Sequence, residues 1–342
     1  MIRSRGLLNK EHLLGELDAL GYSDRIRAIT GLGRDHLGSR EYSQLLTSLL
    51  EGGAYESRLA LMGAIATLDA SVIGSALHHP MASIRNMAAG LLPKVASAEE
   101  IERELPQLSQ DCRRKLLRTV ALMNRQELAE RLLPVVQARW GPEEAAIVLQ
   151  ACSAATVRAR LVELGYAIKD WKKLASRHLE VVAECFTREL EAAPLRAKGM
   201  VWSRFSSAME QLSNHKPDLV LAYAVNHGPA DMLPPSLKAN LGILMRLRPG
   251  AVYELLIRTQ TRGELMTYGL PEAVLKRAKL LTMDQWSQLA KLLADQPQHV
   301  ARLLEHLAPS WRQEIFDAVY EEEKRREWIS GEVTVCIATC AA

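Results

Sequence analysis

Two adjacent histidines are the first residues of this chain whose type and spacing could support chemistry. His78 and His79 carry imidazole rings of the kind that bind metal ions. Neighbouring side chains on a helix or turn point in different directions, however, and no cysteine or carboxylate cluster nearby completes a coordination sphere. We therefore interpret the pair as histidines of a turn, and we predict no metal site.

A second cluster combines basic side chains with one aromatic ring. The stretch KDWKKLASR contains Lys169, Trp171, Lys172, Lys173 and Arg177. Cations beside an aromatic ring could contact phosphates and stack on a base. The same residues also fit a helix that packs its tryptophan in a core and leaves its cations in solvent. Both interpretations stay open, and nucleic-acid contact is the alternative.

Signatures of common enzyme classes are absent from the sequence. It contains no GxxxxGK[ST] phosphate loop, no GxSxG nucleophile turn and no HExxH zinc motif. Cys112 lies next to Arg113 and Arg114, two cations that would stabilise a thiolate, but no paired base can be named. We predict no catalytic residue and no cofactor.

The composition favours a helical protein, and the cysteines favour a reducing compartment. Leu and Ala dominate the 342 residues, only 3 are Phe, and the formal net charge is +3. That charge is far from the basic patch of a dedicated nucleic-acid binder. The 5 cysteines are widely spaced without a CxxC motif, which excludes a disulfide scaffold and a zinc site. No signal peptide or membrane-length apolar run occurs, so we expect no membrane partner and a cytoplasmic location, with the nucleus as the alternative.

The elements that hold these residues repeat along the first half of the chain. In residues 77–95, a helix ends near Leu77, Pro80 marks a turn, and a second helix follows with an apolar stripe and an early arginine, Arg85. Ser83 is the predicted N-cap of that second helix.

The arginine of the template recurs at a nearly constant interval. Arg27, Arg58, Arg85 and Arg114 are separated by 31, 27 and 29 residues, and Glu144 stands 30 residues after Arg114. We interpret these arginines as mainly structural: their guanidinium groups would bond turn carbonyls or an acidic neighbour. The alternative is a ladder that presents charge to a ligand.

This pattern resembles the short variety of the HEAT-like repeat family. The residues that carry the resemblance best are Pro80, Ile84, Arg85, Ala88, Ala89, Leu92 and Val95. The triplet Ile26-Arg27-Ala28 matches the core of the pattern, and Glu144 departs from it. The resemblance covers about residues 10–160 and implies an all-α fold, an α-solenoid of stacked antiparallel helix pairs forming a HEAT/armadillo-like superhelix.

Three organisational segments follow from the pattern. Residues 1–165 are expected to hold HEAT-like repeats, and residues 166–330 degenerate helical hairpins that continue the same solenoid. In the second segment, Leu233, Leu270 and Leu307 each precede a proline-bearing turn and a helix at intervals of 37 residues. Residues 331–342 change to β-branched and small side chains and are expected to form a flexible non-repeat tail.

Two types of enzyme are known among the helical-repeat proteins that this chain resembles, and the sequence can be compared with the motif of each. Helical-repeat enzymes that hold two irons use His-Glu dipeptides, and this chain has none. Others open alkylated DNA bases with a carboxylate and aromatic side chains. Trp140, Trp171 and Trp202 lie 31 residues apart, which suggests equivalent positions in successive repeats.

The preferred hypothesis is a non-catalytic scaffold that binds a segment of another protein on the concave surface of the solenoid. The residues predicted to bind the partner come from the second helices: Arg85, Asn86, Arg114, Lys115, Arg118 and Glu144. The alternative is a nucleic-acid-binding solenoid, including the DNA-base-repair type, that uses residues 169–177. An accessory lyase or cofactor-loading role is compatible with the repeat type, but the sequence offers no residue for it.

Overall fold

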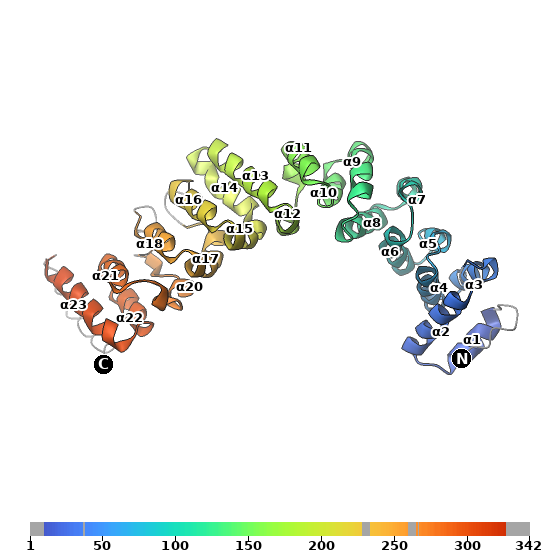
Figure 1. Cartoon of the computed structure of the whole chain (residues 1–342), viewed down its shortest axis with the longest axis horizontal. Coiled ribbons are helices and arrows are strands. Elements are labelled where there is room, and N and C mark those ends of the chain that lie inside the picture. Colours follow the sequence, from blue (N-terminus) through green and yellow to red (C-terminus); the bar gives the residue numbers. More distant parts are fainter. Residues whose placement is uncertain (1–9, 37, 228–232, 259–264, 266, 326–342) are drawn as a thin grey trace. The chain divides into compact units, whose positions relative to one another are not determined.

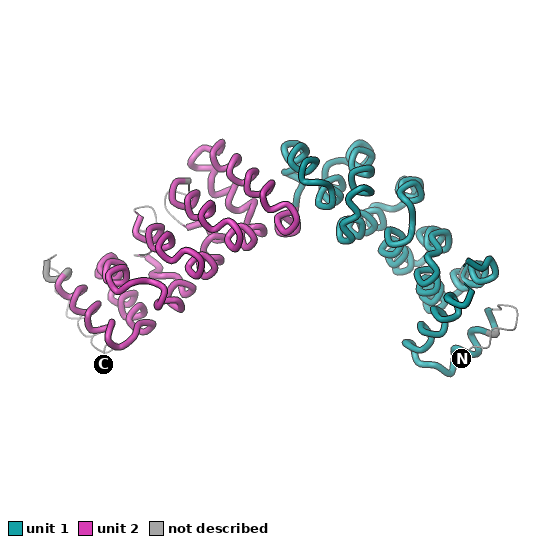
Figure 2. The backbone as a smooth tube through the Cα atoms, viewed as in Figure 1, with its two compact units in different colours: residues 1–168 teal, residues 169–342 magenta. Residues whose placement is uncertain are grey.

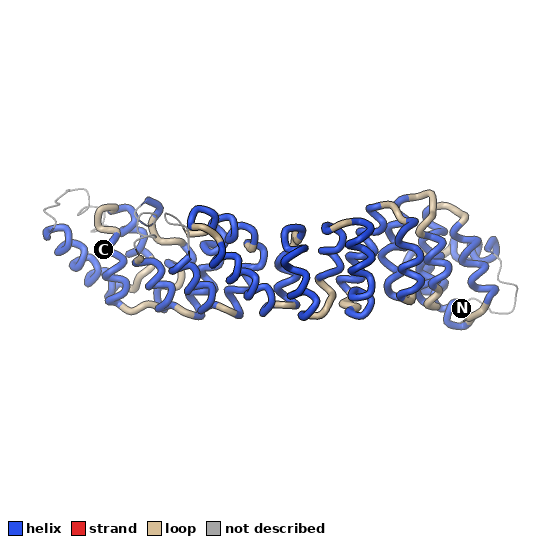
Figure 3. Tube along the Cα trace, turned by 90° about the horizontal axis from the view of Figure 1, so that it is seen from above, coloured by secondary structure: helices blue, strands red, loops and turns tan. Residues whose placement is uncertain are grey.

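The computed structural model describes residues 10–36, 38–227, 233–258, 265 and 267–325. Every regular element in these ranges is helical, and short loops join the helices (Figure 3). The chain is therefore all-α over its described residues, as its Leu- and Ala-rich composition predicts. The tail predicted at residues 331–342 lies outside the described residues.

The chain divides into two compact units (Figure 2). Unit 1 comprises residues 1–168 and unit 2 comprises residues 169–342. The sequence analysis placed the change of repeat type between residues 165 and 166.

Unit 1 contains two rows of helices. Its helices are α1 (Lys10–Asp18), α2 (Tyr22–Asp35), α3 (Arg40–Leu50), α4 (Ala54–Ala66), α5 (Ala70–Ala76), α6 (Ala82–Leu91), α7 (Ala98–Glu104), α8 (Gln110–Leu122), α9 (Gln126–Trp140), α10 (Pro142–Leu149) and α11 (Ala154–Leu164). In one row, which we call the even row, α2, α4, α6, α8 and α10 contact one another in succession. The other row, which we call the odd row, contains α1, α3, α5, α7 and α9 (Figure 1).

Helix starts in unit 1 use different local devices. Ser39 and Asp69 cap α3 and α5 through their side chains, and Ser97 forms a reciprocal capping box with Glu100 at α7. The prediction for Ser83 is wrong. Helix α6 begins one residue earlier, at Ala82, and no side chain caps it.

Unit 2 also pairs alternate helices. Its helices are α12 (Trp171–Arg177), α13 (Leu179–Ala192), α14 (Lys198–Arg204), α15 (Met209–His215), α16 (Pro217–His227), α17 (Pro235–Leu247), α18 (Pro249–Ile257), α20 (Glu272–Leu275), α21 (Met283–Leu292), α22 (Pro297–Glu305) and α23 (Pro309–Arg325). Contacts run along α12, α15, α17 and α20, and along α13, α16, α18, α21 and α23.

The 37-residue interval corresponds to a recurring structural position in unit 2. Leu233, Leu270 and Leu307 are all buried, and each lies two residues before the start of α17, α20 or α23. Proline stands at the first helical position of α17 and α23, where its missing N–H costs no hydrogen bond. The prolines therefore fit the helix starts that the sequence pattern places there.

Candidate functional site

The recurring arginines of unit 1 bind the turn that precedes their own helix. Arg25, Arg85 and Arg113 each occupy the fourth position of α2, α6 and α8. Each guanidinium donates to the carbonyl oxygen five residues earlier, at Leu20, Pro80 and Leu108, over 2.6, 2.5 and 3.1 Å. Arg312 of α23 repeats this contact with the Leu307 carbonyl at 3.0 Å. Of the four arginines for which the sequence predicts a carbonyl-bonding role, Arg85 makes this contact.

The register of that prediction is wrong at three of the four arginines. In α2 the carbonyl-bonding arginine is Arg25, because Arg27 is exposed and pairs with Asp24 within its own helix at 3.3 Å. In α8 it is Arg113 and not Arg114. Arg58 lies one position further along α4 and its side chain is exposed, while Ser57 takes the fourth position.

Glu144 is the centre of a buried ion-pair cluster, and this corrects its predicted role in partner binding. Its side chain is 1% exposed and accepts two hydrogen bonds from Arg113, at 2.6 and 3.0 Å. Arg114 lies 3.6 Å from Glu144 and 3.0 Å from Glu143. The Arg113 guanidinium also stacks over the Trp140 ring at 4.5 Å. Glu144 holds α8 to α10 and has no surface for a partner.

Three of the other predicted partner-binding residues are exposed. Asn86 of α6 and Lys115 and Arg118 of α8 lie at the surface, whereas Arg85 is half-buried against its turn. Arg58 of α4, which the sequence analysis treated only as a repeat marker, is exposed as well. Among the described residues, no ion pair involves Arg58, Lys115 or Arg118. We call these three residues and Asn86 the even-row stripe.

The basic cluster at residues 169–177 differs from the predicted nucleic-acid surface. Trp171 is 1% exposed and packs on Phe205, with the ring centres 4.3 Å apart, so its ring is not available to stack on a base. Lys172 pairs with Glu210 at 2.7 Å, and Lys173 pairs with Asp170 at 3.3 Å. Lys169 and Arg177 are exposed and make interactions of their own. The packing interpretation of the tryptophan is correct.

The three tryptophans do not occupy equivalent positions. Trp140 is the last residue of α9, Trp171 is the first residue of α12, and Trp202 lies inside α14. Trp202 packs edge-on against Phe186 at 5.0 Å. Their equal spacing in sequence is therefore not a shared site.

The two histidines have separate roles. His79 is buried, and its Nδ1 accepts a hydrogen bond from the Met81 N–H at 3.1 Å. The proton of the neutral ring is therefore on Nε2, which donates to the Leu50 carbonyl at 3.0 Å. His78 is exposed and pairs with Glu104 at 3.1 Å. Both residues lie in the turn between α5 and α6, as the turn interpretation predicts, and their rings bond different partners.

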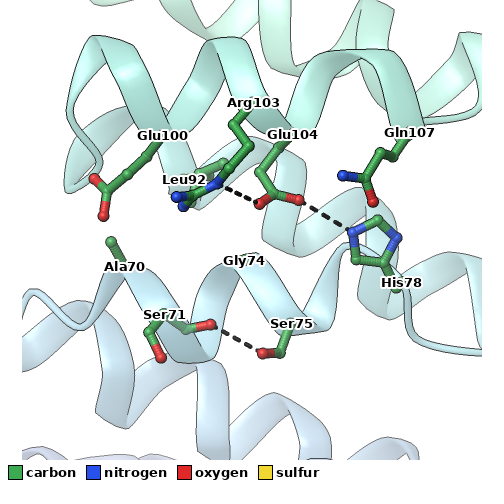
Figure 4. A pocket seen from close by; sticks show the side chains of 10 residues that line it. All are labelled: Ala70, Ser71, Gly74, Ser75, His78, Leu92, Glu100, Arg103, Glu104 and Gln107. Carbon is green, nitrogen blue, oxygen red and sulfur yellow. Dashed lines mark hydrogen bonds and ion pairs between the residues drawn. The ribbon is translucent and has the colours of Figure 1, made fainter.

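His78 lies at one side of a polar groove of about 330 Å³ in the odd row (Figure 4). Helices α5 and α7 contact each other little there, because α5 presents the small residues Ala70, Ser71, Gly74 and Ser75. Glu104 lies between His78 and Arg103, and it bonds both. Within the described residues, no group of three His, Cys, Asp or Glu side chains is arranged to hold a metal ion. The charges of the groove are largely satisfied by one another.

Cysteine chemistry is limited by burial. Cys112, Cys152 and Cys185 are free and buried. Burial raises the pKa of the Cys152 thiol to about 12 and that of Cys185 to about 11, with Glu130 and Glu189 adding to the effect. Cys112 is 3% exposed, so the thiol that the sequence analysis considered beside Arg113 is closed to a substrate.

No protein-family model, curated protein or solved structure matches this chain. Among the described residues, no helix is both long enough and apolar enough to cross a membrane.

Proposed function

We propose that each unit is an α-solenoid of stacked antiparallel helix pairs of the HEAT-like kind. Successive contacts between alternate helices support this arrangement. Side-chain contacts between neighbouring pairs support it too, because they join residues about one repeat apart. Arg25 to Tyr55, Arg113 to Glu144 and Arg248 to Asp218 are separated by 30, 31 and 30 residues. Stacking of this kind exposes one side of a helix row as a long surface.

We propose further that the protein is a non-catalytic scaffold and that the even-row stripe of unit 1 binds another protein. The observation that carries the proposal is the contrast between neighbouring cations. Arg113 and Arg114 form ion pairs with Glu144 and Glu143. Lys115 and Arg118 on the same helix are exposed, and they form no ion pair among the described residues. Unpaired surface cations in a row contribute little to stability, but they are suited to recognition.

The cytoplasm is the proposed compartment, with the nucleus as the alternative. Free buried thiols at Cys112, Cys152 and Cys185 suit a reducing environment. Nucleic acid is the alternative partner. It loses support at residues 169–177 because Trp171 is buried and Lys172 and Lys173 are paired.

The test is an affinity capture from the native cell extract with matched variants. The tagged wild-type chain is compared with Lys115→Glu/Arg118→Glu, and with Arg40→Glu/Arg139→Glu, which makes the same charge change on α3 and α9 of the odd row. Each capture is done with and without nuclease, and circular dichroism establishes that the variants melt like the wild type.

A protein that is captured by the wild type and the odd-row variant, but lost with the stripe variant, would support the scaffold. Partners that disappear from the wild type on nuclease treatment would favour nucleic acid instead. Equal capture by all three chains would exclude the stripe as the binding surface.

A further inference from the structure

The two helix rows of unit 1 differ in charge. Taken together, α2, α4, α6 and α8 carry 9 basic and 4 acidic side chains, and α6 carries no acidic residue. The last helix of the row, α10, carries Glu143 and Glu144. Taken together, α3, α5, α7 and α9 carry 4 basic and 7 acidic side chains. The acidic excess comes from the short helix α7, which contains Glu99, Glu100, Glu102 and Glu104. The even-row helices α6 and α8 are therefore basic and the odd-row helix α7 is acidic, although the net charge of the whole chain is only +3.

Ion pairs within each row decide which charges remain for a partner. In the odd row, Arg131 of α9 pairs with Glu99 and Glu102 of α7. In the even row, Glu143 and Glu144 of α10 are used by α8. On α4, α6 and α8, the exposed cations that form no ion pair among the described residues are Arg58, Lys115 and Arg118. The exposed carboxylate on the described residues of these helices is that of Asp111.

The stripe is continuous between α6 and α8. A Cβ atom at Gly90 of α6 would lie 3.6 Å from the Lys115 side chain, so Lys115 of α8 lies directly beside α6. The Cys112 thiol lies 3.8 Å from the Asn86 amide oxygen, which joins the same two helices one turn earlier. Half-buried Met62 of α4 and Met87 of α6 add apolar surface. Methionine adapts its shape to different apolar partners.

We propose that the even-row stripe binds an extended acidic segment of a partner protein, with carboxylates at Arg58, Lys115 and Arg118 and apolar side chains on Met62 and Met87. This inference rests on the proposed scaffold function and specifies the partner. Two helix spacings of 8–10 Å separate α4 from α8, about 20 Å in all. An extended chain covers that distance with about six residues. The recognition element is thus a short segment in which acidic and apolar residues alternate.

Nucleic acid fits this surface less well than an acidic peptide. Single strands are held by aromatic rings on which bases stack. The aromatic residue on α4, α6 and α8 is Tyr55, and the Arg25 guanidinium covers its ring at 5.2 Å. The cations of the stripe are also too few and too widely spaced to follow a phosphate backbone, which presents a charge at each nucleotide.

The experiment is a fluorescence anisotropy titration of the full chain. Three labelled probes are used: a peptide of alternating Glu and Leu, a peptide of the same length with Lys in place of Glu, and an oligothymidylate. The proteins are the wild type, Lys115→Glu/Arg118→Glu and the odd-row control Arg40→Glu/Arg139→Glu. The acidic peptide should bind the wild type and the control alike, and the stripe variant about tenfold more weakly. Its affinity for the wild type should fall as salt is added.

Three results would overturn the inference. They are no binding of the acidic peptide to the wild type, equal binding to the stripe variant, and tighter binding of the oligothymidylate or the basic peptide. The capture experiment separates this failure from a failure of the scaffold function. A captured protein that depends on Lys115 and Arg118 but binds through a segment without acidic residues would leave the scaffold standing and remove the acidic segment.

Discussion

At the scale of single residues, neighbouring charges with the same chemistry have opposite roles. Glu143 and Glu144 are adjacent in α10, and each pairs with an arginine of α8. The Glu143 side chain is 55% exposed, while that of Glu144 is 1% exposed. An exposed pair contributes little to stability, whereas removal of one partner of a buried pair leaves an uncompensated charge in the interior.

We therefore expect Glu144→Gln to lower the free energy of unfolding by about 3 kcal/mol, because the Arg113 guanidinium loses its buried counter-charge. The matched change Glu143→Gln should cost about 0.5 kcal/mol or less. Urea denaturation followed by circular dichroism measures both. Equal losses in the two variants would contradict the assignment of Glu144 to a structural cluster.

Burial of titratable groups predicts how stability depends on pH. The pKa of the Cys152 thiol is raised to about 12 and that of Cys185 to about 11, chiefly by burial, and burial also raises the pKa of Tyr42. The folded state therefore keeps protons that the unfolded state releases above about pH 9. The contribution of these buried protonated groups to stability is fully present below about pH 9, and it is lost as the pH rises toward 12.

The expected result is a melting temperature that falls steadily above pH 9. Cys152→Ala and Cys185→Ala should each make that fall shallower, and Ser176→Ala, at an exposed site on α12, should not. A slope that both cysteine variants leave unchanged would show that other groups govern the alkaline transition.

At the scale of elements, close packing between hairpins depends on small residues. A Cβ atom at Gly63 of α4 would lie 2.6 Å from the Tyr42 hydroxyl oxygen and 2.7 Å from Leu46 of α3. At Gly31 of α2, a Cβ atom would meet no atom within 4 Å. Both glycines lie inside helices, so alanine improves helix propensity equally at the two positions.

Gly63→Ala should thus destabilise the protein by about 1–3 kcal/mol through overpacking, while Gly31→Ala should stabilise it by up to about 1 kcal/mol. Thermal denaturation of the two variants compares them directly. Stabilisation of the protein by Gly63→Ala as well would mean that α3 and α4 can separate without cost.

The elements themselves were largely predictable, and the register of their polar residues was not. Apolar periodicity placed helices after Leu233, Leu270 and Leu307, because a buried stripe repeats with the helix period. It could not distinguish Arg113 from Arg114. Adjacent positions at a helix start are chemically alike in sequence, and only the turn geometry decides which side chain reaches the carbonyl at residue 108.

In the candidate site, too, some features could be predicted from the sequence and others could not. Asn86, Lys115 and Arg118 are exposed because these polar residues lie off the apolar stripe, and their role in partner binding stays a prediction. The type and neighbours of Glu144 predict a surface position, and for Trp171 they leave a surface role open as the alternative to packing in a core. Both are buried because a partner far away in sequence covers them: Arg113 for the first and Phe205 for the second. Spacing alone cannot reveal such partners.

At the scale of the whole molecule, the two-row arrangement of unit 1 makes its stability depend on contacts between neighbouring helix pairs. In unit 1, α8 contacts α6, α9 and α10, and it makes no extensive contact with α2 or α4. A repeat array with contacts of this kind loses stability gradually when its end is removed. A protein with one central core loses its fold at once.

Fragments of unit 1 test this distinction. A chain of residues 1–168 should be helical by circular dichroism and should unfold cooperatively, because the contacts of the unit lie within it. A chain of residues 1–124 lacks α9, α10 and α11, so Arg113 loses Glu144 and α8 loses one covered face. It should remain helical and melt at a lower temperature. A shorter fragment without helical signal would instead indicate a single cooperative core, and the solenoid would have to be abandoned for unit 1.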